Sequence, residues 1–179
     1  MVELGTLKIL VCGEGGVGKS SLLDRYVHDK FDDNSSLTKG IGFFSKIIRY
    51  NSDSQEYNAI FWDFGGQMQF RFMLPNFVGG AVGCILAFDL TRFNSMLQIE
   101  AWIKELTEHI DLPILLVGTK YDLLSETSQS DDFVKNIIKN HDRIIDFMKT
   151  SAKDDFNVKK AFNRLIGFLI ENKYISKIK

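Results

Sequence analysis

The chain has 179 residues, of which 45% are hydrophobic and 25% charged, and its formal net charge is −1 at pH 7. This length and composition are typical of one globular domain with a full core, and we treat residues 1–179 as a single unit. The near-zero net charge gives no electrostatic case for binding nucleic acid or an anionic membrane. No stretch approaches the ~18 apolar residues of a membrane span.

Apolar runs alternate with helical patterns along the chain. The runs are continuous rather than alternating, which indicates strands buried on both faces; they lie at 7–12, 57–63, 81–88, 113–117 and 144–148. Ser95 and Gln98 have the spacing of a capping box, which predicts that a helix begins there. Further helices are predicted near 131–140 and after Asp154 and Asp155. This alternation predicts a parallel sheet with helices on both faces.

Residues 42–50 leave no room for a helix before the run at 57–63. The turn residues at 51–54 therefore predict an antiparallel hairpin, with 42–50 as the edge strand. The expected fold is an α/β sandwich of three layers. It has a six-stranded, mostly parallel sheet, one antiparallel edge strand and about five helices.

The segment GEGGVGKS, residues 13–20, lies between the first predicted strand and a helical pattern. Glycines let successive backbone N–H groups point into one concavity that holds an anion, and the following helix N-terminus adds further donors. Lys19 supplies a positive charge for the outer phosphates of a nucleotide, and Ser20 a hydroxyl ligand for Mg²⁺. A random chain of this size matches the pattern about once in a hundred, so a phosphate site is predicted.

Two further segments suit phosphate chemistry. Asp63 ends an apolar strand, where its carboxylate can hold Mg²⁺ through water, and Gly66 offers a backbone N–H without a side chain in the way. Gln67 can orient an attacking water, since its amide both donates and accepts. Thr38 can add a hydroxyl to Mg²⁺ from a polar loop. An ordinary strand-ending turn and a loop threonine without a role are the alternatives for each segment alone.

Two segments near the end of the chain suit a guanine base. Asp122, after Thr119 and Lys120, can accept hydrogen bonds from two adjacent N–H groups of guanine, which adenine does not offer. Lys120 can lay its stem along a base face. Ser151, in the segment 150–153, can brace the loop that holds Asp122. A charged loop and a helix cap explain these segments if each stands alone.

Together these segments resemble the Ras-type small GTPases over essentially the whole chain. The resemblance implies a P-loop NTPase G domain that binds GTP or GDP with Mg²⁺ and hydrolyses GTP slowly, on the order of 10⁻⁴ to 10⁻² s⁻¹. It implies catalytic roles for Gln67, Thr38 and Lys19, and Mg²⁺ ligation by Ser20, Thr38 and, through water, Asp63. The nucleotide is assigned to Gly13, Gly15, Gly16, Val17, Gly18, Lys19, Ser20, Ser21, Thr38, Asp63, Gly66, Thr119, Lys120, Asp122, Ser151, Ala152 and Lys153.

The chain also departs from the family pattern. Counting forward from Ser20 places Thr38 where the family keeps its Mg²⁺-ligating threonine, whereas counting from the Ile41–Gly42 pair places Gly40 there. Thr119 stands where an asparagine is usual, and the lost amide is expected to leave the phosphate loop without a brace.

The resemblance also implies partners. Phe43, Trp62 and Phe77 are similar to the aromatic triad that Rab proteins present to effectors, while residues 62–67 and 73–75 are similar to fungal septation GTPases and archaeal small GTPases. Segments 32–42 and 64–75 are expected to act as switches toward effectors, an exchange factor and a GTPase-activating protein. No lipidation signal is visible at either end, so we expect a cytoplasmic monomer, soluble or recruited peripherally by partners.

Two other functions compete with the switch. One is a non-catalytic adaptor, in which the nucleotide only stabilises the fold, and the second is a P-loop kinase or ATPase. Gly66 and Gln67 argue against the adaptor, and the guanine-reading segments argue against the ATP-dependent enzymes.

Overall fold

The computed structural model describes residues 5–34, 36–50, 55–67, 73–124 and 130–174. Its centre is a six-stranded sheet with the order β2-β3-β1-β4-β5-β6. The strands are β1 (Gly5–Cys12), β2 (Ile41–Arg49), β3 (Glu56–Phe64), β4 (Gly83–Asp89), β5 (Ile114–Thr119) and β6 (Ile144–Lys149). β2 is antiparallel to β3, as predicted, and the other pairings are parallel. The turn predicted at 51–54 lies outside the described residues.

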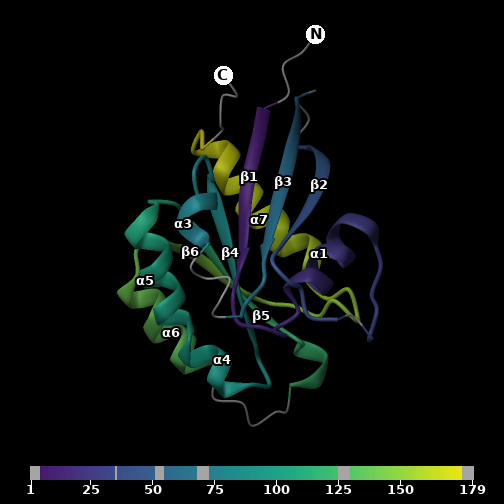
Figure 1. Ribbon diagram of the computed structural model, residues 1–179, viewed down its shortest axis with the longest axis vertical. Coiled ribbons are helices and arrows are strands. Elements are labelled where there is room, and N and C mark those ends of the chain that lie inside the picture. Colours follow the sequence, from purple (N-terminus) through teal and green to yellow (C-terminus); the bar gives the residue numbers. More distant parts are fainter. Residues whose placement is uncertain (1–4, 35, 51–54, 68–72, 125–129, 175–179) are drawn as a thin grey trace.

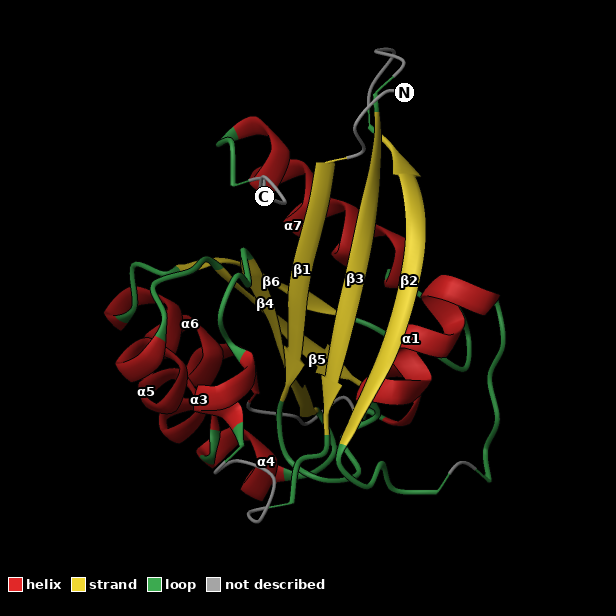
Figure 2. Ribbon diagram, turned by 45° about the horizontal axis from the view of Figure 1, so that its top comes forward, coloured by secondary structure: helices red, strands yellow, loops and turns green. Residues whose placement is uncertain are grey.

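Helices cover both faces of the sheet (Figure 1). They are α1 (Lys19–His28), α3 (Leu74–Phe77), α4 (Phe93–Leu97), α5 (Ile99–His109), α6 (Ser130–Asn140) and α7 (Val158–Glu171), with a short 3-10 helix, η1 (Tyr121–Leu123). Side chains of α1 and α7 share one hydrophobic cluster with the sheet, and those of α3, α4, α5 and α6 share the other. Figure 2 shows the sheet between these two layers of helices.

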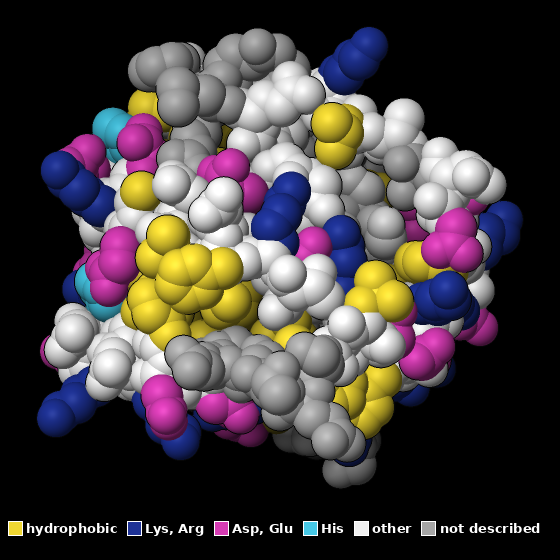
Figure 3. Space-filling model, turned by 90° about the horizontal axis from the view of Figure 1, so that it is seen from below, with side chains coloured by type: hydrophobic (Ala, Val, Ile, Leu, Met, Phe, Trp, Pro, Cys, Tyr) yellow, Lys and Arg dark blue, Asp and Glu magenta, His cyan; other side chains and the backbone are white. Residues whose placement is uncertain are grey.

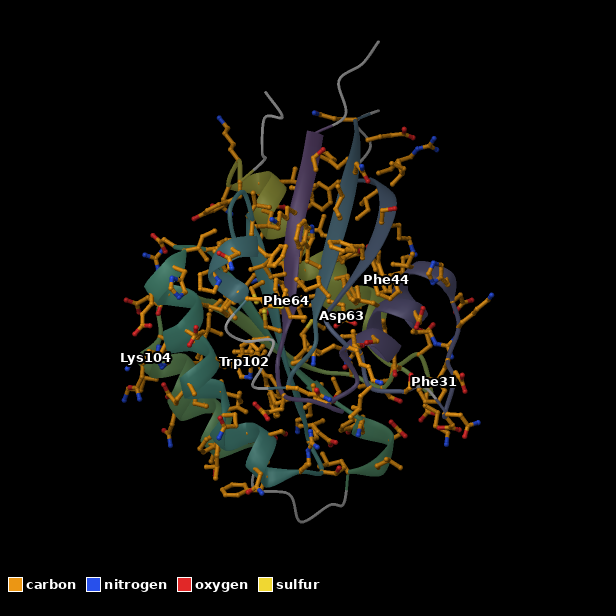
Figure 4. All side chains as sticks on the ribbon, in the orientation of Figure 1. Phe31, Phe44, Asp63, Phe64, Trp102 and Lys104 are labelled. Atoms are coloured by element: carbon orange, nitrogen blue, oxygen red, sulfur yellow. The ribbon has the colours of Figure 1, made fainter. Side chains whose placement is uncertain are left out.

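β1 explains why the predicted strands are continuous apolar runs. Leu10 and Cys12 point into one cluster, while Ile9 and Val11 point into the other, and all four are fully buried. Each face of the strand therefore needs apolar residues. On α5 the two sides differ: Figure 4 shows Trp102 pointing toward the sheet and Lys104 pointing away from it.

One predicted helix start is wrong. Ser95 lies inside α4 and does not cap a helix that begins there; α5 begins at Ile99. The Ser95 hydroxyl instead donates to the backbone oxygen of Arg92, at 2.7 Å, and accepts from the backbone N–H of Asp89, at 3.0 Å. Serine hydroxyls compete for local backbone groups in this way, so a cap pattern alone does not fix a helix boundary.

The carboxyl ends of the five parallel strands meet at one edge of the sheet, where open α/β sheets bind ligands. All the segments singled out from the sequence follow or precede strands at this edge. Figure 3 looks onto it, and positive side chains lie beside acidic ones near the middle of the face.

Candidate functional site: a phosphate loop and a base pocket

The loop from Gly13 to Gly18 connects β1 to α1 and runs tightly against neighbouring strands. A Cβ on Gly13 would lie 2.0 Å from the Ala87 oxygen, and the φ of Gly13 is +137°, so only glycine fits there. A Cβ on Gly66 would lie 2.1 Å from the Glu14 carbonyl carbon. The backbone after β3 therefore packs directly on the phosphate loop.

Lys19 begins α1 and turns back across this loop. Its Nζ donates to the backbone oxygens of Gly13 and Glu14, each at 2.9 Å, and the residue is only 5% exposed. Burial is the main reason that the pKa of Lys19 lies below its ordinary value. A buried ammonium is costly unless a negative charge pairs with it. This position among backbone groups is therefore suited to binding an anion.

Three side-chain oxygens from separate elements meet beside Lys19. Ser20 Oγ on α1 donates to Asp63 Oδ2 on β3. Thr38 Oγ1, from the loop before β2, lies 2.5 Å from Ser20 Oγ and donates to Asp63 Oδ2 at 3.3 Å. The structure thus brings Thr38 into this group. Gly40 lies elsewhere, with its backbone oxygen accepting from Gly65 N at 2.8 Å.

The second oxygen of Asp63 is left over. Within the described part of the chain, Oδ1 is buried without a hydrogen-bond partner, and burial raises the pKa of this carboxyl. A buried carboxylate oxygen without a donor is costly unless a cation or an ordered water reaches it. Hard divalent cations prefer oxygen ligands such as these hydroxyls and this carboxylate, so the residues present fit Mg²⁺.

Gln67 lies beside the phosphate loop. A Cβ on Gly15 would lie 3.9 Å from Gln67 Cγ, an ordinary van der Waals distance, so the two residues are neighbours. Gly66 and Gln67 both face the cavity described below.

The two segments predicted to read the base are held in place by contacts within the chain. Ser151 Oγ donates to Asp122 Oδ1 at 2.7 Å, which is the bracing contact that the sequence predicted. Lys120 Nζ donates to the Gly16 oxygen at 3.0 Å and pairs with Asp89 at 2.7 Å. These contacts join both base-reading loops to the phosphate loop and to β4.

Thr119 corrects one expectation. Its hydroxyl donates to the Val17 oxygen at 2.5 Å and also lies 3.0 Å from the Phe88 oxygen. The phosphate loop therefore keeps a brace at this position although the chain has no asparagine there. A hydroxyl at the end of β5 suffices because the loop passes within hydrogen-bond reach of the strand.

Arg25 is a residue that the sequence analysis missed. From α1, its Nε donates to the Ala152 oxygen at 2.8 Å and its guanidinium also reaches the Lys153 oxygen at 3.4 Å. It thereby ties α1 to the loop that holds Ala152 and Lys153. The contact joins residues 127 positions apart, and no local pattern indicates it.

One cavity of about 330 Å³ joins these parts. The predicted residues that line it are Gly15, Gly16, Gly18, Lys19, Ser20, Ser21, Thr38, Gly66, Gln67, Thr119, Lys120, Asp122, Ala152 and Lys153. Four other predicted residues do not line it: Gly13, Val17, Asp63 and Ser151. Of these, Asp63 and Ser151 contact residues that line it, Ser20 and Asp122 respectively.

Comparison with known proteins identifies the family. A model of the Ras family matches residues 8–171, a range that includes every segment of the cavity. The chain belongs to the Ras family. It is therefore a small GTPase, an enzyme that binds guanine nucleotide and hydrolyses GTP, and the predicted G-domain fold is confirmed.

Rab-related proteins are among the similar family members. Ras-related protein Rab-18 of Lymnaea stagnalis is 36% identical over 170 residues, which cover 93% of this chain and 81% of the relative. Ras-related protein RABA5c of Arabidopsis thaliana is 35% identical over 167 residues, 92% of this chain and 76% of the relative. Ras-related protein Rab11B of Nicotiana tabacum is 35% identical over 161 residues, covering 89% and 72%. The predicted Rab-like character of this Ras-family chain is thus confirmed.

The three aromatic residues predicted as an effector surface form a row in this Ras-family chain. The ring of Phe43 lies edge-on to Trp62 at 4.7 Å, and Trp62 lies 5.8 Å from Phe77 between centroids. Lys8 Nζ stacks over Trp62 at 3.8 Å and donates to the Phe77 oxygen at 2.6 Å. Phe43 is 61% exposed, so the end of the row at β2 faces solvent.

Among the described residues, no helix has the length and apolar character needed to cross a membrane.

Proposed function

We propose that this Ras-family chain is a guanine-nucleotide switch that holds GTP or GDP with Mg²⁺ in the 330 Å³ cavity. The observation that carries the proposal is the meeting of Ser20, Thr38 and Asp63 beside Lys19, with one buried carboxylate oxygen left over. A loop residue joins this group, so the site and the first switch segment, 32–42, are coupled.

The residues around the phosphates have separate tasks. Lys19 and the loop N–H groups neutralise and orient the phosphate oxygens, while Ser20, Thr38 and Asp63 would hold Mg²⁺, which when bound offsets charge that develops on the phosphates. Gln67 positions the attacking water, because its amide can accept from that water and donate to a phosphate oxygen. Gln67 neighbours Gly15 of the phosphate loop.

Base selection rests on Asp122. Its carboxylate accepts hydrogen bonds from two adjacent N–H groups of guanine, and Ser151 holds the carboxylate in place. Adenine would leave this acceptor unpaired, and a site built on buried polar partners rejects such analogues by about 10⁴-fold or more. Lys120 flanks the base with its aliphatic stem.

We further propose that the row of Phe43, Trp62 and Phe77 faces effectors, as part of the surface made by segments 32–42 and 64–75. Residues 68–72 of the second segment lie outside the described residues. An exchange factor and a GTPase-activating protein complete the proposed cycle, with the chain acting in the cytoplasm as a monomer, soluble or recruited peripherally by its partners.

Nucleotide competition tests this proposal. A fluorescent GDP bound to the purified chain should be displaced by GTP and GDP but not by a hundredfold higher concentration of ATP, and removal of Mg²⁺ by a chelator should weaken binding. Asp122→Ala should lose the discrimination, while Asp142→Ala, on an exposed loop, should keep it. Equal displacement by ATP would contradict the base site. Binding of a partner that is equally tight to the GDP form and the GTP-analogue form would favour the adaptor instead.

A further inference from the structure

Arg92 reaches the phosphate loop from outside the cavity. Its guanidinium NH2 group donates to the Gly15 oxygen at 2.7 Å. A Cβ placed on Gly16 would lie 3.8 Å from the other guanidinium nitrogen, NH1. The side chain therefore lies along the Gly15–Gly16 peptide, and the sequence patterns gave no role to this residue.

The backbone of Arg92 is fixed by the turn between β4 and α4. Arg92 N donates to the Asp89 oxygen at 3.1 Å, and the Arg92 oxygen accepts from Ser95 Oγ at 2.7 Å. Ser95 is only 4% exposed and also bonds the Asp89 backbone. A side chain that starts from such a tied turn loses less freedom when it docks on the loop.

Arg92 is one of three donors that hold successive carbonyls of the loop. Arg92 holds the Gly15 oxygen, Lys120 the Gly16 oxygen and Thr119 the Val17 oxygen. In a planar trans peptide the N–H points away from the C=O. Donors that hold these carbonyls from outside therefore direct the N–H group of the same peptide toward the concavity. These are the N–H groups of Gly16, Val17 and Gly18.

The Arg92 contact lies at the end of the loop where the third phosphate is expected. Gly15 is the loop residue that faces Gln67, at 3.9 Å from a Cβ on Gly15 to Gln67 Cγ, whereas Thr119 and Lys120 act further along the loop.

We propose that Arg92 is a positioning residue for the third phosphate. It holds the Gly15–Gly16 peptide so that the Gly16 N–H is directed to the phosphate that distinguishes GTP from GDP, and it adds positive charge on that side. This inference rests on the proposed function of the cavity. It assigns to Arg92 a preference for the GTP-bound state rather than a part in nucleotide binding as a whole.

The test compares affinities for GDP and a non-hydrolysable GTP analogue in the parent, Arg92→Met and Arg92→Lys, with Arg49→Met as the control. Arg49 is an exposed arginine that pairs with Glu56 on β3. A charge-assisted hydrogen bond is worth about tenfold or more, so Arg92→Met should bind the analogue ~10-fold more weakly while GDP affinity changes less than ~3-fold. Arg92→Lys should recover part of the loss, and Arg49→Met should match the parent.

Other outcomes overturn the inference. An equal loss for both nucleotides would make Arg92 a general support of the loop, and unchanged affinities would remove its role. A melting temperature close to that of the parent confirms that each variant is folded. If the parent itself binds neither nucleotide, the proposed function fails; if the parent binds both and Arg92→Met behaves like it, only the role of Arg92 fails.

Discussion

The hydroxyl of Thr38 lies 2.5 Å from the hydroxyl of Ser20, although the two residues belong to a loop and to the first turn of α1. Leu37, next to Thr38, is 53% exposed. Two polar contacts of Thr38, with Ser20 and with Asp63, therefore join an exposed segment to the base of the site. We therefore expect the order of the proposed switch segment, 32–42, to depend on what occupies that base.

Replacing Thr38 with valine tests this dependence. The variant keeps the shape of the side chain but loses the hydroxyl, so we expect the stabilisation by Mg²⁺ to weaken more for a GTP analogue than for GDP. The measurement is the melting temperature with each nucleotide, with and without Mg²⁺. Thr107→Val is the matched control, since the Thr107 hydroxyl donates to backbone oxygens of its own helix, those of Ile103 and Lys104. Identical Mg²⁺ responses in Thr38→Val and the parent would contradict the role of Thr38.

Asp63→Asn should separate stability from binding. The parent buries a carboxylate with one oxygen unpartnered among the described residues, and an unsatisfied buried polar group costs about 1–3 kcal/mol, more when the group is charged. Without nucleotide, the variant should therefore melt several degrees higher than the parent, at roughly 2–4 °C per kcal/mol. With Mg²⁺ and GTP the order should reverse, because only the parent gains binding energy. A variant that is less stable in both conditions would count against a cation at Asp63.

The sequence predicted the fold and named the segments that line the cavity, because both depend on local patterns. Continuous apolar runs marked strands buried on two faces, and the glycine loop marked its own strand-to-helix position. What the sequence could not predict was contacts between distant segments. Arg25 reaches Ala152 across 127 positions and Arg92 reaches Gly15 across 77, and neither arginine belongs to a recognisable pattern.

The two errors have the same origin. Ser95 matched a local cap pattern, but the Asp89 backbone, six residues away, took its hydroxyl. Thr119 was expected to leave the phosphate loop without a brace because it lacks the amide of asparagine. In the fold its shorter side chain reaches the Val17 oxygen. In both cases the partner is set by packing of the chain around the sheet, which residue types alone do not report.

The ionisation of Asp89 makes the stability of the fold depend on pH in the acid range. Burial alone raises its pKa, but hydrogen bonds from Lys120 and Thr91 outweigh burial and bring the pKa below the ordinary value of 3.8. Because the folded pKa is the lower one, the stabilisation is fully present above pH ~4 and is lost as the pH falls through the folded pKa. Asp89→Asn should therefore lower stability at pH 7 and flatten its decline in acid. Denaturant unfolding between pH 2 and 7 measures this, and Asp142→Asn, at an exposed position, should keep the parent slope.

Gln67→Leu tests the chemical step on its own. Leucine fills similar space but can neither accept from water nor donate to a phosphate, so GTP and GDP should bind as in the parent while hydrolysis slows by roughly 100-fold or more. Single-turnover phosphate release from the preloaded protein measures the rate, and competition with labelled GDP measures the affinities. Gln55→Leu, an exposed glutamine before β3, should hydrolyse GTP at the parent rate. Hydrolysis at the parent rate in Gln67→Leu would mean that another group orients the water. Gln67 faces Gly15 at the end of the loop that Arg92 holds. That result would therefore also remove the main support for placing the third phosphate at this end of the loop.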